Sequence, residues 1–548
     1  MAACRTSSPP PDDTTAPAPT RAPAVEPDAG AAAPAAPDAT VAAPAPARAW
    51  WRDVVGYEIF VRSFQDSNGD GIGDLQGVTD RLDYLKDLGV GLVWLMPINP
   101  SPSYHGYDVV DYRDVNPEYG TLANLDALVA AGKQRGIKII IDLLLNHSSD
   151  KNPWFIESKS GPASPKRDWY IWRKDAPEGW ARPWDGAPLW HKLPGPPGGA
   201  DEYYYALFWS GMPDLNLANP AVEREMQDIM RFWLARGLAG FRVDAIRYLI
   251  EGEHGETADT PMTHDFIKRM RKAVDKDYPE ALLLGEAWTS AEDQAGYYGD
   301  GDELDMTFSF DMAAAMVECA KDGVRSRLNQ IVDRSQELFA KDRGFEAPFL
   351  TNHDMPRVMR QLWGDAARMR VAAAAMLAAP GTPFIYYGEE IGMVGGEARD
   401  DENKRTPMHW NADKNGGFTT GTPWWPMTDE KAGVDVATQS ADAGSLLNLY
   451  KRLVKTRLGS EALRHGDQAR LDLHAGKGVI GFVRTAGAAR VLVLLNFDGA
   501  AVEGFSVPVA GKPRVLAAEG LVGAPTSDGQ AVAVGGLGPQ SFAWIALE

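Results

Sequence analysis

The sequence predicts an α/β protein built on a (β/α)8 TIM barrel, with a subdomain inserted after the third strand and an antiparallel β-sandwich at the C-terminus. Short apolar runs alternate eight times with amphipathic stretches, and four of these runs end in carboxylates. Parallel strands covered on both faces are apolar throughout. A barrel also gathers the ends of its strands, with the acids they carry, at one mouth. Alternating β runs after about residue 459 predict the sandwich.

The eight apolar runs are the expected barrel strands. In chain order they cover residues 57–64, 91–97, 137–145, 240–243, 282–285, 305–310, 348–352 and 384–387. Amphipathic stretches between them predict surrounding helices, over residues 79–88, 122–135, 220–236 and 264–276. Alternation of strand and helix repeated eight times favours a closed barrel over an open sheet.

Differences in composition divide the chain into four parts. Residues 1–48 are rich in Ala and Pro and poor in large apolar side chains, which predicts a disordered linker. The catalytic barrel is expected over residues 49–147 and 214–457. The interval 148–213 is rich in Trp, Pro and Gly and is expected to be a domain inserted over the barrel mouth, here called domain B. Residues 458–548 are the expected C-terminal sandwich.

The net charge and the N-terminus bear on partners and location. The 548 residues include 75 acidic and 55 basic side chains, and the net charge of −20 argues against a nucleic-acid partner. No run approaches the roughly 20 apolar residues of a membrane span. Met1-Ala2-Ala3-Cys4 resembles the end of a bacterial lipoprotein signal. We therefore expect an exported protein, extracellular or anchored to a membrane through a lipid on Cys4; the alternative is a chance Cys in an Ala-rich tail.

Two carboxylates at neighbouring strand ends are expected to perform the chemistry. Asp244 ends the fourth expected strand and Glu286 the fifth, and neighbouring strands lie about 4.8 Å apart. Retaining glycosidases need a nucleophile and a proton donor whose carboxyl groups lie about 5–5.5 Å apart. Arg242, two residues before Asp244, points to the same face of the barrel and would keep Asp244 ionised. We expect Asp244 to be the nucleophile and Glu286, its pKa raised by neighbouring acids, to be the acid and base.

Further polar residues lie at the other strand ends. Asp354 follows the seventh expected strand, where its charge would stabilise an oxocarbenium-like transition state. His147 and His353 each lie beside a strand end that carries carboxylates, and their ring nitrogens can hydrogen-bond sugar hydroxyls. For either His–Asp pair taken alone, a structural hydrogen bond is the alternative. Asp142 lies further back on its strand and is expected to support the site without performing the chemistry.

Four segments resemble the conserved segments of glycoside hydrolase family 13, the α-amylase family. They are Asp-x-x-x-Asn-His at 142–147, Gly-Phe-Arg-x-Asp at 240–244, Gly-Glu-x-Trp at 285–288 and Asn-His-Asp at 352–354. The resemblance extends over about residues 50–548. It implies a catalytic barrel followed by a β-sandwich, and an enzyme that cleaves glucosidic bonds.

The resemblance also implies a role for individual residues. It makes Asp244 the nucleophile, Glu286 the acid and base, and Asp354 the stabiliser of the transition state. A tyrosine of the family that stacks on the sugar is matched by Tyr107. The residues implied to bind the sugar at the cleavage subsite are Tyr107, His147, Arg242 and His353.

Three features bear on specificity, and they disagree. Met-Pro-Asp-Leu-Asn at 212–216 resembles the segment of members intermediate between oligo-1,6-glucosidases and neopullulanases, a group that includes maltooligosaccharide-forming amylases. At Ala245 the family has valine for α-1,6 cleavage and smaller residues for α-1,4 cleavage, although plain packing is the alternative. The run 404–410 resembles that of α-glucosidases. It predicts an ion pair between Arg405 and Asp108 that would narrow the substrate-binding pocket and favour exo action.

A glycine-rich loop after the first strand predicts a bound Ca²⁺. In residues 66–74 oxygen ligands fall at alternate positions, as in the first part of an EF-hand. The expected ligands are Asp66, Asn68, Asp70, the carbonyl of Ile72, and Asp74. Gly77 stands where an EF-hand has Glu, so a complete EF-hand is excluded. The family resemblance implies such a calcium loop too, whereas a solvated turn is the alternative.

These features predict a retaining α-amylase that hydrolyses α-1,4-glucosidic bonds, with an α-glucan such as starch or maltodextrin as its partner. One alternative is an exo-acting α-glucosidase or a glucan-rearranging enzyme such as a trehalose synthase. Another is a relative that has lost its acids and only binds or transports. The intact Asp244, Glu286 and Asp354 argue against the latter.

Overall fold

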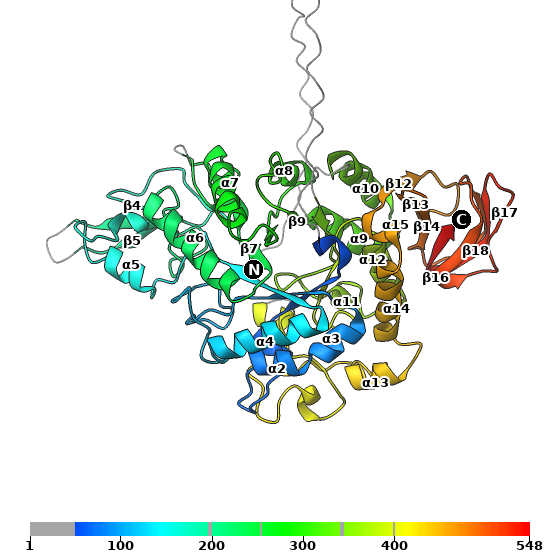
Figure 1. Ribbon diagram of the computed structural model, residues 1–548, viewed down its shortest axis with the longest axis horizontal. Helices are drawn as coiled ribbons and strands as arrows, with labels where there is room; N and C mark the ends of the chain where they lie inside the picture. Colours follow the sequence, from blue (N-terminus) through cyan, green and yellow to red (C-terminus); the bar gives the residue numbers. More distant parts are fainter. Residues whose placement is uncertain (1–49, 196–199, 253–254, 340–344, 398–399) are drawn as a thin grey trace, which may run out of the picture. The chain divides into compact units, whose positions relative to one another are not determined.

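The computed structural model describes residues 50–195, 200–252, 255–339, 345–397 and 400–548 (Figure 1). Cys4 and the linker expected over residues 1–48 lie outside these ranges, so export and a lipid anchor stay predictions. None of the helices in the described ranges combines the length and the apolar composition of a membrane span.

Eight parallel strands form the predicted barrel. They are β1 (Gly56–Ile59), β2 (Leu92–Leu95), β3 (Lys138–Leu143), β7 (Gly240–Val243), β8 (Leu282–Gly285), β9 (Met306–Phe308), β10 (Glu346–Ala347) and β11 (Phe384–Tyr386). The hydrogen-bonded order is β10-β9-β8-β7-β3-β2-β1-β11. Two backbone bonds join the ends of this series, from Thr382 N to Glu346 O (2.9 Å) and from Phe384 N to Pro348 O (2.9 Å). The sheet therefore nearly closes on itself, and the barrel fold is confirmed.

The first and seventh strands differ most from their expected ranges. The seventh strand is the short β10, not residues 348–352, because Pro348 has no N–H to donate to a continuing ladder. The first strand ends at Ile59, where its pairing with β2 ends. The residues that follow form the short helix α1 (Val61–Phe64) instead of continuing the strand.

Helices cover the barrel strands. They are α2 (Leu75–Asp80), α3 (Leu82–Leu88), α4 (Leu122–Arg135), α6 (Pro220–Ala235), α7 (Pro261–Asp275), α8 (Ala291–Gly296), α9 (Phe310–Asp322), α10 (Ser326–Phe339), α11 (Val358–Gln361), α12 (Ala366–Ala378), α13 (Val436–Ala441), α14 (Leu446–Leu458) and α15 (Glu461–His465). α6 shows why such segments are helical. Asn219 caps its first turn, Pro220 occupies the first helical position, and every third or fourth residue from Val222 to Trp233 is buried.

Between β3 and β7 the chain forms a small unit of its own. It contains α5 (Pro153–Ser158) and three antiparallel strands in the order β4 (Trp172–Arg173), β6 (Glu202–Tyr205), β5 (Trp190–Leu193). Backbone bonds from Ser148 N to Pro213 O (3.1 Å) and from Leu215 N to Asn146 O (2.8 Å) join its two ends. The inserted segment is thus fixed to the end of β3, beside the expected active site.

The C-terminal part is an antiparallel sheet. Its strands are β12 (Asp467–Leu471), β13 (Val479–Ala486), β14 (Ala489–Asn496), β15 (Val502–Val507), β16 (Pro513–Leu521), β17 (Thr526–Ser527) and β18 (Val532–Leu547). The order is β12-β13-β14-β18-β15, and β16 and β17 also pair with β18. Alternate residues of β14 enter two cores: Val491 and Val493 join the barrel core, while Leu492 and Leu494 pack within the sheet domain. Both faces of β14 are therefore buried, which explains why this run is apolar at consecutive positions.

Candidate active site

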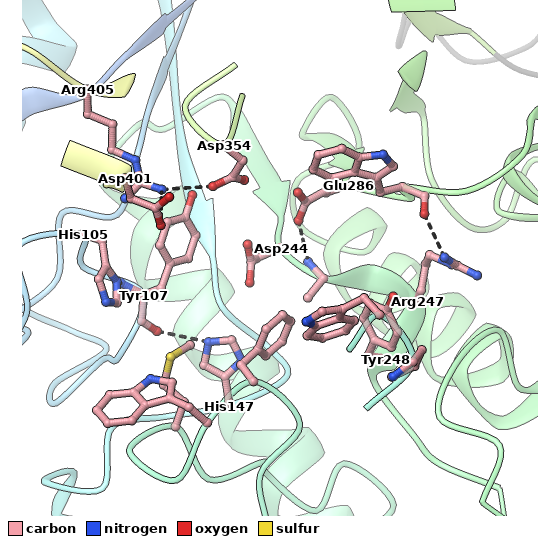
Figure 2. Close-up of a pocket in the computed structure, with 17 residues that line it drawn as sticks. His105, Tyr107, His147, Asp244, Arg247, Tyr248, Glu286, Asp354, Asp401 and Arg405 are labelled. Atoms are coloured by element: carbon pink, nitrogen blue, oxygen red, sulfur yellow. Dashed lines mark hydrogen bonds and ion pairs between the residues drawn. The ribbon is translucent and has the colours of Figure 1, made fainter. Parts of the chain in front are cut away.

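The two expected catalytic acids lie side by side at the barrel mouth. β7 and β8 pair in parallel, and the register ends with Val243 opposite Gly285. Asp244 and Glu286 are the next residue of each strand, and Glu286 N still donates to Val243 O (3.0 Å). Figure 2 shows their side chains, together with that of Asp354, directed toward a common space. The strand pairing therefore brings the two carboxyl groups together.

That space is a cavity of about 760 Å³, large enough for several sugar rings. Its walls combine acids, histidines and a large share of aromatic rings. The lining residues are His105, Tyr107, His147, Pro183, Trp184, Phe208, Trp209, Met212, Asp244, Ala245, Arg247, Tyr248, Glu286, Trp288, Asp354, Asp401 and Arg405. Six of the nine residues that the sequence predicts for catalysis or sugar binding belong to this wall: Tyr107, His147, Asp244, Glu286, Asp354 and Arg405.

The buried Arg242 connects three carboxylates beneath the cavity. β3 and β7 place it opposite Asp142. Its Nη1 lies 2.6 Å from Asp142 Oδ1 and 2.6 Å from Asp244 Oδ1, and its Nη2 lies 2.9 Å from Glu286 Oε2. Its side chain is 1% exposed, so water does not screen these contacts. Arg242 therefore fixes the positions of both catalytic acids from behind, and Asp142 supports Arg242.

Glu286 has the electrostatic character of a proton donor. Burial raises its pKa to about 8, and the negative charges of Asp244 and Asp354 act in the same direction. These effects outweigh the opposing influence of Arg242 and of the Ala245 N–H, which donates to Glu286 Oε2 (3.1 Å). The carboxyl group is therefore protonated near neutral pH, as a general acid requires.

Asp354 is held in the opposite state. Burial alone would raise its pKa, but His353 and Arg405 lower it well below the usual range of an aspartate. His353 Nε2 lies 3.2 Å from Asp354 Oδ2, and His353 Nδ1 lies 2.5 Å from Glu58 Oε1. These two acids raise the pKa of His353 to about 9 in spite of burial. Asp354 therefore stays ionised across the cavity from a protonated Glu286.

The expectation of an ion pair between Asp108 and Arg405 is wrong. Arg405 donates to Asp354 Oδ1 (3.0 Å) and to the carbonyl of His353 (3.0 Å). The Asp108 carboxylate instead accepts from the hydroxyls of Ser101 (2.5 Å) and Ser103. The Asp108 carboxylate thus has two nearby hydroxyl groups as hydrogen-bond donors. Arg405 instead pairs with the charged Asp354 at the cavity.

Three residues expected to bind sugar lie behind the cavity wall. Asp108 and Arg242 are almost fully buried, and His353 is fully buried. The ring of Tyr107 stacks on that of His353 (5.6 Å, 16°), and its hydroxyl lies 2.6 Å from His353 Nε2. Tyr107 thus separates His353 from the cavity. His147 does reach the cavity, and burial lowers its pKa, so its ring is neutral.

Five further residues from distant segments belong to the site without having been expected: Glu58 supports it from behind, and four others line the cavity. Glu58 on β1 pairs with His353, and a single carboxylate inside an apolar strand was the signal that could have indicated it. Trp184 and Trp209 come from domain B, and Arg247 and Tyr248 from the loop after β7. No motif marks these four residues, because their direction depends on how the loops fold over the barrel.

The loop with the expected calcium ligands is organised by its own hydrogen bonds. Asp66 Oδ1 accepts from the backbone N–H of Asn68 (2.9 Å), and Asp70 Oδ1 accepts from that of Ile72 (2.8 Å). Asp74 caps α2 through Gly77 N (2.7 Å). The donor set consists only of oxygens, which fits Ca²⁺. However, no three His, Cys, Asp or Glu side chains of the described residues are gathered to hold a metal, so the calcium site stays a prediction.

A barrel that pairs an aspartate with a protonated glutamate at adjacent strand ends defines a glycoside hydrolase. The sequence pattern of the family described as "Alpha amylase, catalytic domain" matches residues 58–466. The chain therefore belongs to the α-amylase family, glycoside hydrolase family 13, as the four strand-end segments predicted.

Known proteins similar to this chain differ in the reactions their names state. "Alpha-amylase 3" of Dictyoglomus thermophilum is 37% identical over 77% of this chain and 80% of its own length. The "Oligo-1,6-glucosidase" of Parageobacillus thermoglucosidasius is 34% identical over 82% and 91%. Among solved structures, an α-amylase from H. orenii superposes with a TM-score of 0.80 and 36% identity, over 90% of this chain and 99% of that one. These names state two different activities, so the similarity alone does not decide which glucosidic bond this chain cleaves.

Proposed function

We propose that this chain is a retaining α-amylase that hydrolyses α-1,4-glucosidic bonds of starch and maltooligosaccharides. The observation that carries the proposal is the Asp244–Glu286 pair, set side by side by β7 and β8 and fixed by Arg242. The similarity to the two α-amylases supports the choice of substrate.

The proposed reaction has two steps. Asp244 attacks the anomeric carbon, the bond to the leaving oxygen breaks, and Glu286 gives its proton to that oxygen. The charge of Asp354 stabilises the oxocarbenium-like transition state. In the second step Glu286, now a carboxylate, takes a proton from water, and the hydroxyl attacks the anomeric carbon. The bond to Asp244 breaks, and both carboxyl groups return to their initial states.

The preference for α-1,4 bonds rests on Ala245. It lines the cavity between the two catalytic acids, and its backbone is left-handed (φ 47°). A β-branched residue is strained in this conformation and would occupy more of the cavity. The small methyl group of Ala245 therefore agrees with the residue type that the family has for α-1,4 cleavage.

An exo-acting α-glucosidase or a glucan-rearranging enzyme is the second candidate. The similarity to an oligo-1,6-glucosidase and the resemblance of residues 404–410 favour it. However, Arg405 pairs with Asp354 and not with Asp108. A pocket narrowed by the Asp108–Arg405 pair is thus no longer a reason to expect exo action.

A maltoheptaoside blocked at its non-reducing end separates the two candidates. We expect the enzyme to cleave it internally, because an endo-acting cleft does not need a free chain end. Chromatography of the products, with unblocked maltoheptaose as the control, makes the measurement. Glucose release from the unblocked substrate alone would contradict the proposed endo action and support the α-glucosidase.

We also propose that Ca²⁺ binds the 66–74 loop and stabilises it. Gly71, at the turn position of the loop, has φ +95°, and a Cβ there would lie 1.9 Å from the carbonyl oxygen of Thr422. The loop is thus packed against another segment, so an ion that holds it would stabilise both. Asn68 and Asp70 are exposed residues whose side chains carry oxygens that suit such an ion.

Removal of calcium should therefore lower the melting temperature. With a Ca²⁺ concentration about 100 times the Kd, binding stabilises a protein by about 2.7 kcal/mol. Differential scanning calorimetry with EDTA and with added Ca²⁺ measures the shift. In Asp70→Ala the shift should disappear, whereas the exposed Asp87→Ala outside the loop should keep it. A wild-type melting temperature that does not respond to Ca²⁺ would contradict the proposal.

A further inference from the structure

A hairpin of domain B reaches the cavity and carries an exposed tryptophan at its tip. Residues 181–188 form this hairpin, closed by a bridge between Ala181 and Pro188. Backbone bonds join Arg182 N to Ala187 O (2.9 Å) and Gly186 N to Arg182 O (2.8 Å). Trp184 lies at the tip and lines the cavity, yet 49% of it remains exposed. Where several large apolar side chains are exposed together, they mark a surface that binds a partner or a ligand.

The hairpin is held in a fixed position. Arg182 forms an ion pair with Asp185 and donates to the carbonyl of Phe208. Asp185 also accepts from Ala187 N (3.0 Å). The ring of Trp184 contacts that of Phe208, with centroids 5.6 Å apart. A ring positioned in this way loses little conformational entropy when it meets a ligand.

The position of Trp184 relative to the catalytic acids indicates which part of a substrate it meets. Its ring lies 6.0 Å from that of Tyr248. Figure 2 shows Tyr248 and Arg247 on the Glu286 side of the cavity, opposite Asp401 and Arg405. The proton donor faces the leaving oxygen, so the leaving sugar lies on this side.

A second exposed ring belongs to the same side of the cavity. Trp288 follows Glu286 by two residues and is 48% exposed. One face of its ring stacks on Phe310, with centroids 4.6 Å apart and planes 12° apart. Its carbonyl accepts from Arg247 Nη1 (2.8 Å). The leaving side of the cavity thus presents two oriented tryptophans, one from domain B and one from the barrel.

We propose that Trp184 is a stacking platform for a glucose unit on the leaving side of the scissile bond, and that it makes the enzyme prefer chains extending beyond the cleavage point. The apolar faces of glucose rings suit flat aromatic rings, and the roughly 760 Å³ cavity has room for them. This inference rests on the proposed function, since it needs an α-glucan substrate. No step of the bond cleavage itself uses Trp184.

The test compares maltoheptaose with α-glucosyl fluoride, whose leaving group is fluoride and cannot contact Trp184. We expect W184A to lower the ratio of kcat/KM for maltoheptaose to that for the fluoride by about threefold to tenfold, the effect of one aromatic contact. W184F should recover most of the ratio. W363A is the matched control, because Trp363 is 64% exposed and does not line the cavity.

Binding supplies a readout that does not depend on turnover. In a Glu286→Gln background, the W184A substitution should raise the Kd for maltoheptaose by a similar factor, and W363A should leave it unchanged. A W184A variant that affects both substrates equally, or neither, would overturn the inference. If the wild type cleaves the fluoride but not maltoheptaose, the proposed α-1,4 activity fails as well, and that failure is visible without any Trp184 variant.

Discussion

Replacing Glu286 by Gln should lower the proposed kcat on maltoheptaose by about 10²–10⁴-fold, the usual contribution of general acid–base catalysis. The amide cannot protonate the leaving oxygen and cannot activate water. The substitution should leave the fold intact, because Gln keeps the size of Glu and can still accept from Ala245 N. Far-ultraviolet circular dichroism and the melting temperature check the fold, and the release of reducing sugar measures the rate.

The same variant should separate the two steps of the reaction. Fluoride leaves with little help from a proton donor, so Glu286→Gln should still form the covalent intermediate from α-glucosyl fluoride. Hydrolysis of that intermediate needs the missing base, and mass spectrometry should detect a glucosyl group on Asp244. Asp244→Asn is the matched control and should form no adduct. Near-normal hydrolysis of maltoheptaose by both variants would exclude this mechanism.

The pH profile gives independent evidence for the acid. The protonated form of Glu286 is needed, and its pKa is raised to about 8. The kcat/KM of the wild type should therefore fall as the pH rises through about 8. Glu286→Gln should lose this alkaline limb, because the amide does not titrate. A limb that persists in the variant would assign it to another group.

The sequence predicted the barrel and its acids because both follow from local rules. Successive parallel strands place their ends at one mouth, so Asp244 and Glu286 could be recognised as neighbours before their contacts were known. The structure shows in addition that Asp244 and Glu286 directly follow the last aligned residues of β7 and β8. Arg242 could be assigned to the same face as Asp244 by the alternation along a strand.

Contacts that depend on the direction of a side chain are harder to predict from the sequence. Arg405 pairs with Asp354 and not with the expected Asp108, because the fold of the surrounding loops determines where its side chain points. Trp184 is more than sixty residues from Tyr248, and only the folded hairpin brings their rings together. The seventh strand, β10, lies before its expected range, because the apolar run continues past Pro348, where the ladder of β10 has already stopped.

Replacing Arg242 by Met should reduce both stability and activity. Arg242 contacts Asp142, Asp244 and Glu286, and the substitution leaves these acids buried without a cation. Removing one partner of a buried ion pair costs about 3–5 kcal/mol of unfolding free energy. Denaturant unfolding followed by fluorescence measures this loss. The activity should fall further than the folded fraction does, because the two catalytic acids lose their common support.

Arg271→Met is the matched control for Arg242→Met. Arg271 is equally buried and pairs with two acids, but these are Asp275 and Asp305 and not the catalytic acids. The Arg271→Met variant should lose a comparable amount of unfolding free energy. Its folded fraction should keep the kcat of the wild type. Adding Asp142→Asn to Arg242→Met removes one unpaired charge, so part of the stability should return while kcat stays low. If kcat returned together with the stability, Arg242 would act only through the fold and not through the positions of Asp244 and Glu286.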